Sequence, residues 1–225
     1  MSLKKTFWLV LTMLSVNLVL FSQPQLPQKA PAKVIMKLDT LIVNKSTSII
    51  IEKPYFPLME EKSREFVTSE IDKLTSPQIS EFIELCYKYE EISSQYYQHW
   101  SCEVVFQSQE IVSLLLRNNL YTGGAHPNTQ IYNLNLNVKE LKHLEKEKFY
   151  PKTDITKLAS YCEKYLKDNS IPYFSEKSLA DEKNFSIWSY TDAGTLFSFP
   201  QYEIAPYSSG IIQIFISNQE LELLK

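Results

Sequence analysis

The sequence predicts an α+β fold, in which an antiparallel β-sheet packs against about three helices. Three observations predict it. Strand-like stretches follow one another through short turns, apolar stripes with helical spacing occur in three places, and these stripes are grouped between strands instead of alternating with them. Hydrophobic residues make up 44% of the chain and charged residues 22%, which is typical of a soluble globular protein.

The first residues have the pattern of a secretory signal. Lys4 and Lys5 precede an apolar run from Phe7 to Phe21, which is shorter than the roughly 20 residues of a membrane-spanning helix. We expect residues 1–22 to be a signal peptide and residues 23–32 a linker. The mature chain would then be extracytoplasmic, periplasmic or secreted, with no stable membrane anchor after cleavage. An uncleaved anchor is the alternative, and its lysines would still favour export of the remainder.

The first half of the mature chain, residues 33–120, should begin with two strands around a turn at Asn44. Two helices are predicted next, and the second should start at Ser76-Pro77 because proline fits the first turn of a helix. A pair of strands should then turn near Ser108. The apolar stripes of the two helices are Met59, Phe66, Val67, Ile71 and Leu74, and then Ile79, Phe82, Ile83, Cys86 and Tyr89.

The second half, residues 121–225, should pack with the first half as one unit. Residues 131–138 alternate between apolar and polar, which predicts a half-buried strand whose wet face carries Asn133, Asn135 and Asn137. Thr153 or Asp154 can cap a third helix. The chain should end in strands over residues 185–190, 195–199 and 210–217.

The three cysteines show no metal-type spacing. Export would permit a disulfide between Cys86 and Cys102. Cys86 and Cys162, however, lie on the apolar faces of predicted helices, so we favour three buried thiols.

Charge and motifs exclude several classes of function. The formal net charge of −3 argues against nucleic acid as a partner, because nucleic-acid binding depends on basic patches. A GxSxG nucleophile motif and HxH or HxxxH metal spacings are absent from the sequence. We therefore expect no cofactor, no metal and no catalytic residue.

Two segments contain the unusual residues. The chain has only 4 glycines, and two of them are adjacent in the first signature segment, residues 121–128. Paired glycines permit a positive φ, and Pro127 keeps His126 extended. The second signature segment, residues 202–210, belongs to a connection that is too long for a tight hairpin. The candidate ligand-binding residues are Tyr121, Gly123, Gly124, His126, Asn128, Tyr202, Glu203, Pro206 and Tyr207.

The two signature segments, Tyr-Thr-Gly-Gly-Ala-His-Pro-Asn and Tyr-Glu-Ile-Ala-Pro-Tyr-Ser-Ser-Gly, resemble the signature blocks of the RsiV-type extracytoplasmic domain. That domain is the outer part of a lysozyme-sensing anti-sigma factor, and it is similar to the accessory region of exported peptidoglycan deacetylases. The resemblance implies binding of a lysozyme-like protein or a peptidoglycan fragment. Only six residues precede Phe7, so we expect no sigma-factor-binding domain ahead of the apolar run, and we expect no deacetylase domain after Lys225.

Several alternatives remain open at this point. His126 and Glu203 should lie close together, either as the general base and acid of a cell-wall hydrolase or as a structural polar pair in a purely structural envelope protein. The aromatic cluster Tyr96–Trp100 could bind carbohydrate, but core packing at a strand edge is the favoured interpretation. His143 should be a solvated surface residue.

Overall fold

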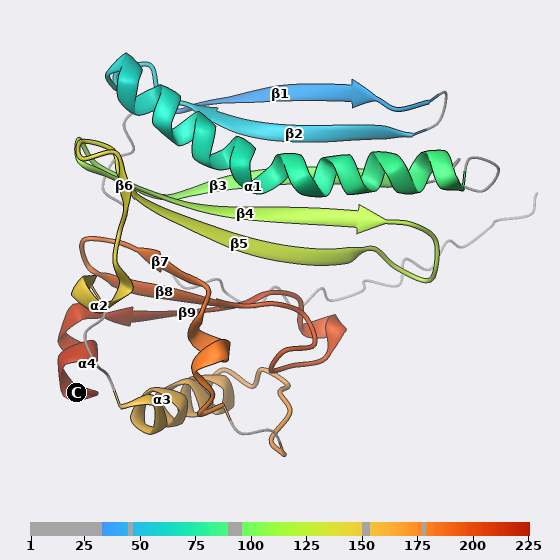
Figure 1. Cartoon of the computed structure of the whole chain (residues 1–225). Helices are drawn as coiled ribbons and strands as arrows, with labels where there is room; N and C mark the ends of the chain where they lie inside the picture. Colours follow the sequence, from blue (N-terminus) through green and yellow to red (C-terminus); the bar gives the residue numbers. More distant parts are fainter. Residues whose placement is uncertain (1–32, 45–46, 90–95, 150–153, 177–178) are drawn as a thin grey trace, which may run out of the picture.

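The computed structural model describes residues 33–44, 47–89, 96–149, 154–176 and 179–225. The chain forms two β-sheets, with a long helix on the first and a shorter helix beneath the second (Figure 1). The predicted α+β class is confirmed. The predicted signal peptide and linker lie outside the described residues.

The first sheet has six strands in sequence order, and every neighbouring pair is antiparallel except β2 and β3, which are parallel. The predicted hairpins around Asn44 and Ser108 are both present. A bulge between Val104 and Phe106 shifts the β3–β4 register. The strands are β1 (Ile35–Ile42), β2 (Ser48–Tyr55), β3 (Tyr97–Gln107), β4 (Ile111–Tyr121), β5 (Asn128–Asn137) and β6 (Lys142–His143).

A single helix, α1 (Glu61–Lys88), covers one face of this sheet. The predicted break at Ser76-Pro77 is therefore wrong. Pro77 lies inside the helix, and α1 bends partway along its length (Figure 1), as helices do where proline removes a hydrogen bond. Val67 and Ile71 before the proline and Phe82 and Cys86 after it are all buried. Burial on both sides of Pro77 offsets its cost of about 3 kcal/mol.

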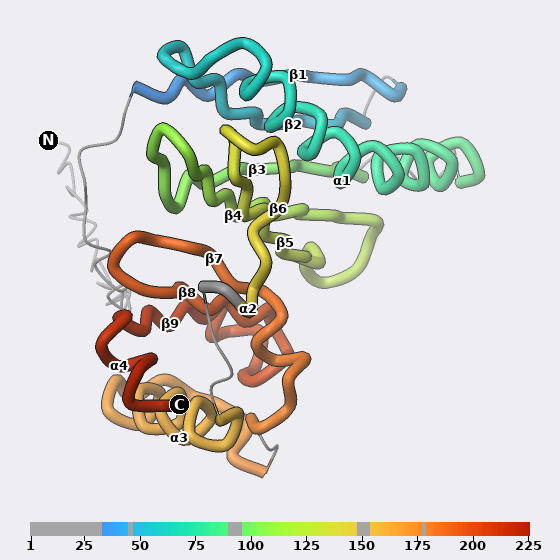
Figure 2. The backbone as a smooth tube through the Cα atoms, turned by 60° about the vertical axis from the view of Figure 1, so that its left-hand side comes forward, coloured from blue at the N-terminus to red at the C-terminus, as the bar shows by residue number. Residues whose placement is uncertain are grey.

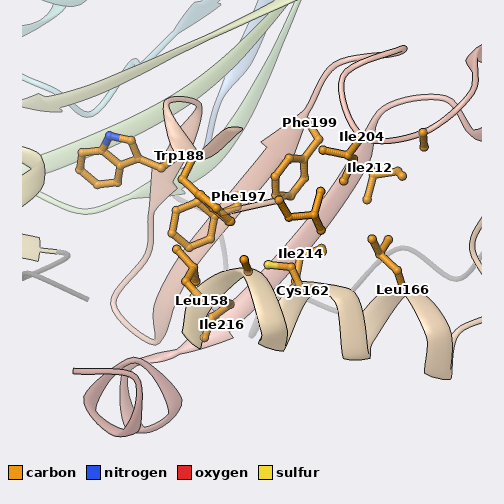
Figure 3. Close-up of a cluster of buried hydrophobic side chains, with 14 of the residues drawn as sticks. Leu158, Cys162, Leu166, Trp188, Phe197, Phe199, Ile204, Ile212, Ile214 and Ile216 are labelled. Atoms are coloured by element: carbon orange, nitrogen blue, oxygen red, sulfur yellow. The ribbon is translucent and has the colours of Figure 1, made fainter. Parts of the chain in front are cut away.

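The second sheet is antiparallel and consists of β7 (Trp188–Tyr190), β8 (Gly194–Phe199) and β9 (Ile212–Ser217). Helix α3 (Ile155–Asp168) packs against it through Leu158, Cys162 and Leu166 (Figure 3). The predicted start of this helix is confirmed, since the Asp154 side chain accepts the Thr156 N–H at 2.8 Å. The remaining helical segments are α2 (Lys146–Phe149), η2 (Glu182–Phe185), η3 (Tyr207–Ser209) and α4 (Asn218–Leu223).

The chain passes from one sheet to the other after β6, as the turned view shows (Figure 2). The boundary that we predicted at residue 121 falls at the last residue of β4, which pairs with β5 in the first sheet. No helix in the described part of the chain combines the length and apolar character that crossing a membrane requires. All three cysteines are free, buried thiols, and burial raises the pKa of Cys102 and of Cys162 to about 12.

Asn135 joins the two sheets. Its side-chain amide donates to the Trp188 carbonyl at 2.8 Å, and its side-chain oxygen accepts the Tyr190 N–H at 2.9 Å and the Ser113 hydroxyl at 2.6 Å. We predicted a solvated Asn135, and this is wrong, because only 3% of the residue is exposed. The polar face of β5 is the face on which β7 packs.

Replacing Asn135 with leucine should destabilise the protein by about 2–4 kcal/mol, since two buried backbone groups of β7 would each lose a partner worth about 1–3 kcal/mol. Urea unfolding measures this loss. Asn133→Leu is the matched control, because Asn133 lies on the same face of β5 but is only half-buried. We expect the control to cost under about 1 kcal/mol. Equal losses in the two variants would contradict the assigned role of Asn135.

Candidate functional site

The first signature segment connects β4 to β5 by a turn that depends on its glycines. Gly123 and Gly124 have φ angles of 96° and 110°, a region that side chains with a Cβ atom rarely adopt. The Tyr121 hydroxyl donates to the Gly124 carbonyl at 2.9 Å. The turn is thereby fixed to the end of β4 and leaves His126 exposed.

The second signature segment lies between β8 and β9. Its turn is closed by the Tyr202 N–H, which donates to the Ala205 carbonyl at 3.0 Å. Tyr202 has a φ of 67°, which is uncommon for a non-glycine residue and strains the backbone. Ile204 and Ala205 are buried beneath the turn, whereas the Tyr202 side chain remains 55% exposed.

The two segments meet around His126. Its ring stacks on the Tyr207 ring with centroids 3.8 Å apart, and its Nδ1 lies 3.1 Å from the Pro127 carbonyl. A carbonyl can only accept, so Nδ1 donates there, and in a neutral imidazole Nε2 then accepts from the Tyr202 hydroxyl 3.4 Å away. The Tyr207 hydroxyl also donates to the Pro127 carbonyl, at 3.2 Å. The predicted meeting of the segments is confirmed.

Sequence reasoning missed Tyr97 as the neighbour of the candidate residue Tyr121. Tyr97 is paired with Tyr121 across β3 and β4, and the two rings stack with centroids 5.7 Å apart. Tyr97 is 40% exposed. We use the name tyrosine face for two groups of rings that the β4–β5 turn links through the Tyr121–Gly124 hydrogen bond. They are the stacked pair Tyr97 and Tyr121 and the cluster of His126, Tyr202 and Tyr207. Of the other candidates, Gly123, Gly124 and Asn128 are exposed, and Pro206 is half-buried.

Glu203 does not join the tyrosine face through His126. Within the described residues, no hydrogen bond links the two side chains, and the buried oxygen Oε2 of Glu203 has no hydrogen-bond partner. Burial, with a smaller contribution from the negative charge of Asp181, raises the pKa of Glu203 to about 7. The hydrogen-bonded His126–Glu203 pair, whether catalytic or structural, is thus not formed.

The aromatic cluster Tyr96–Trp100 is divided between core and surface, as the favoured interpretation predicted. Tyr96 and Trp100 are buried, whereas Tyr97 is exposed. His99 pairs through Nε2 with Glu52 on the neighbouring strand, at 2.9 Å. His143 is exposed, as predicted, and its Nε2 also lies 2.7 Å from the buried Glu70.

Comparison with known proteins finds a family match over part of the chain. Residues 138–219 match the model of DUF3298, a family described as a protein of unknown function. The DUF3298 match spans the second sheet and α3, and it includes the second signature segment but not the first. No curated protein matches the chain in sequence.

Solved structures of DUF3298 proteins share the fold of both halves. A DUF3298 family protein from Pseudomonas aeruginosa PAO1 superposes with a TM-score of 0.60 at 15% identity, over 85% of this chain and 93% of that one. A DUF3298 member from Bacteroides fragilis NCTC 9343 gives a TM-score of 0.56 at 17% identity, over 85% and 92%. At such identities the likeness shows the fold alone. The finer resemblance to the RsiV-type domain stays a prediction.

Replacing Gly123 with valine should destabilise the protein by about 1–3 kcal/mol, because a β-branched residue is strained at a φ of 96°. A Cβ atom there would meet only Tyr96 Cε1, at 3.8 Å, so the cost is conformational rather than steric. Thermal unfolding measures it. Ala125→Val is the control in the same turn, because Ala125 is exposed and has no positive φ. Unchanged stability of Gly123→Val would show that the turn is not strained.

Glu203 should make the protein less stable as the pH rises. The folded protein retains the Glu203 proton up to its pKa of about 7, whereas the unfolded chain releases it near 4.5, the ordinary pKa of a glutamic acid side chain. The unfolded state therefore binds fewer protons between these values, and the free energy of unfolding falls as the pH increases through this window. Glu203→Gln removes the effect. In urea unfolding, the free energy of unfolding of the variant should therefore exceed that of the wild type by more at pH 8 than at pH 5. The control, Glu65→Gln, changes an exposed carboxylate and should follow the wild type at both pH values. A constant difference between Glu203→Gln and the wild type would contradict the assignment.

Proposed function

We propose that this chain is an exported, non-catalytic recognition module that binds a cell-envelope ligand through its tyrosine face. The observation that carries the proposal is the convergence of two segments distant in sequence on one exposed group of rings. His126 contacts Tyr202 and Tyr207, and the Tyr207 hydroxyl reaches the Pro127 carbonyl. The stacked pair of His126 and Tyr207 takes no part in the hydrophobic clusters of the core, and the side chains of His126 and Tyr202 are exposed to a partner.

The chemistry of the tyrosine face suits recognition. Tyrosine presents a large amphipathic area at a low cost in conformational entropy. The rings of Tyr121 and Tyr207 are held in place by hydrogen bonds to backbone carbonyls, so little rotamer freedom would be lost on binding. A preorganised aromatic surface of this kind can contact the apolar faces of sugar rings or a protein cleft.

The proposed ligand is a lysozyme-like protein or a peptidoglycan fragment, and the proposed location is outside the cytoplasmic membrane. The resemblance of the signature segments to the RsiV-type domain supports the ligand, and the signal-like pattern of residues 1–22 supports the location. A non-catalytic role is supported by the surroundings of His126. Its partners are two tyrosines and a backbone carbonyl, which orient the ring but do not activate a nucleophile.

Binding of the purified chain to a C-type lysozyme and to soluble muropeptides should be saturable in isothermal titration calorimetry for one of these ligands. Tyr202→Ala should weaken that binding by roughly 30-fold, since a central aromatic residue of an interface contributes about 2 kcal/mol. His126→Ala should have a similar effect, because it removes the ring on which Tyr207 stacks.

Tyr87→Ala is the matched control, since Tyr87 is 65% exposed on α1 and takes no part in the tyrosine face. It should bind as the wild type does. Absence of binding to both ligands, or equal weakening by Tyr87→Ala and Tyr202→Ala, would overturn the proposal.

A further inference from the structure

A cleft of about 360 Å³ lies between the C-terminal half of α1 and the first sheet. Its strand side is formed by Gln98 on β3, Asn118 and Leu120 on β4, and Gln130 on β5. Its helix side includes Phe82 and Leu85, with Gln78, Glu81, Glu84 and Lys88 also contributing. The volume is at the lower end of the range of small-molecule sites, about 300–1,000 Å³.

Two residues that line this cleft, Gln98 and Asn118, each have a buried carbonyl oxygen that lacks a donor among the described residues. Gln98 and Asn118 are each only 1% exposed, and no donor among the described residues reaches Gln98 Oε1 or Asn118 Oδ1. The next residues along the strands on the same face, Trp100 and Leu116, are buried and apolar. An unpaired buried carbonyl costs about 1–3 kcal/mol, so the core alone gives no reason for amides at these two positions.

A hydrogen-bond network orients the Asn118 amide. Its Nδ2 lies 3.3 Å from Gln78 Oε1 and 3.4 Å from Gln130 Oε1, and the Tyr132 hydroxyl reaches the same two oxygens, at 2.9 Å and 3.1 Å. The donor end of Asn118 is thus occupied by Gln78 and Gln130. Its carbonyl oxygen is left for a donor from elsewhere.

We infer that this cleft binds one unit of a neutral sugar, a hexose or an N-acetylhexosamine. Ring hydroxyls, or the N–H of an acetamido group, would donate to Gln98 Oε1 and Asn118 Oδ1. Phe82, Leu85 and Leu120 would pack against the apolar face of the ring. The lining carries two carboxylates, Glu81 and Glu84, against one ammonium group, Lys88, so its charge disfavours an anionic ligand, and the two amides carry no charge with which to hold a cation. Such a site combines a largely apolar wall with a few converging polar groups, as small-ligand sites do.

The cleft is distinct from the tyrosine face, although both lie at the same end of the first sheet. Successive residues of a strand point to opposite faces. Gln98 and Leu120, which are paired in the register, therefore face α1, whereas the neighbouring pair Tyr97 and Tyr121 faces away from it. Sugar binding in the cleft consequently goes beyond the function proposed for the tyrosine face and can be tested apart from it.

Titration of the purified chain with tri-N-acetylchitotriose and with cellotriose in a calorimeter tests the inference. Binding of chitotriose alone would assign the acetamido group as the donor, and binding of both sugars would assign the ring hydroxyls. Gln98→Leu should weaken the binding at least tenfold, yet its melting temperature should be unchanged or higher, because the variant removes an unpaired buried carbonyl.

Gln107→Leu is the matched control, since Gln107 lies at the other end of β3 and also has a buried oxygen without a partner in the described chain. It should bind sugar as the wild type does. Leu120→Trp, which fills the cleft but keeps both carbonyl oxygens, should abolish binding and serves as a second variant should Gln98→Leu fold poorly. Binding of neither sugar, or binding that survives both cleft variants, would overturn the inference.

Discussion

The position of the second sheet on the first depends on the hydrogen bonds of Asn135. The side-chain amide of Asn135, on β5, is bonded to the backbone of both Trp188 and Tyr190 of β7. Its oxygen also accepts the Ser113 hydroxyl of β4. Buried polar contacts of this kind tolerate little change in geometry. They fix where β7, and hence the sheet that β7 begins, lies on the first sheet. This position also brings the β8–β9 connection to the β4–β5 turn, where the Tyr207 hydroxyl donates to the Pro127 carbonyl.

Local features of the fold could be predicted from the sequence, whereas those that depend on distant partners could not. The hairpins and the Asp154 cap follow from residues within a few positions of one another. The burial of Asn135 depends on partners 53 and 55 residues away, so its alternation with apolar neighbours suggested a solvated face. Pro77 suggested a helix break for a similar reason. The sheet that buries α1 before and after Pro77 is distant in sequence, so the local pattern gives no sign of it.

The candidate site, too, could be predicted from the sequence only where its features are local. The conformational freedom of Gly123 and the exposure of His126 could be predicted from residues 121–128 alone. The contribution of Tyr97 could not, because its pairing with Tyr121 requires the bulge between Val104 and Phe106. Without this bulge the register would be one residue different, and the two rings would not be cross-strand partners. The strained φ of Tyr202 likewise gives no signal in a sequence, since tyrosine has no preference for that conformation.

The amides of the first sheet illustrate how one residue type can serve stability on one face and binding on the other. Asn135 and Asn118 lie on neighbouring strands and are both almost fully buried. All the polar atoms of Asn135 have partners from β4 and β7, so this amide stabilises the contact between the sheets. Among the described residues, the Asn118 side chain has partners only at its nitrogen, and its oxygen, like that of Gln98 in the same cleft lining, has none. An unpaired buried carbonyl lowers the stability of the free protein. Its presence in the lining of a cleft is expected at a binding site, where residues are kept for the ligand at a cost in stability.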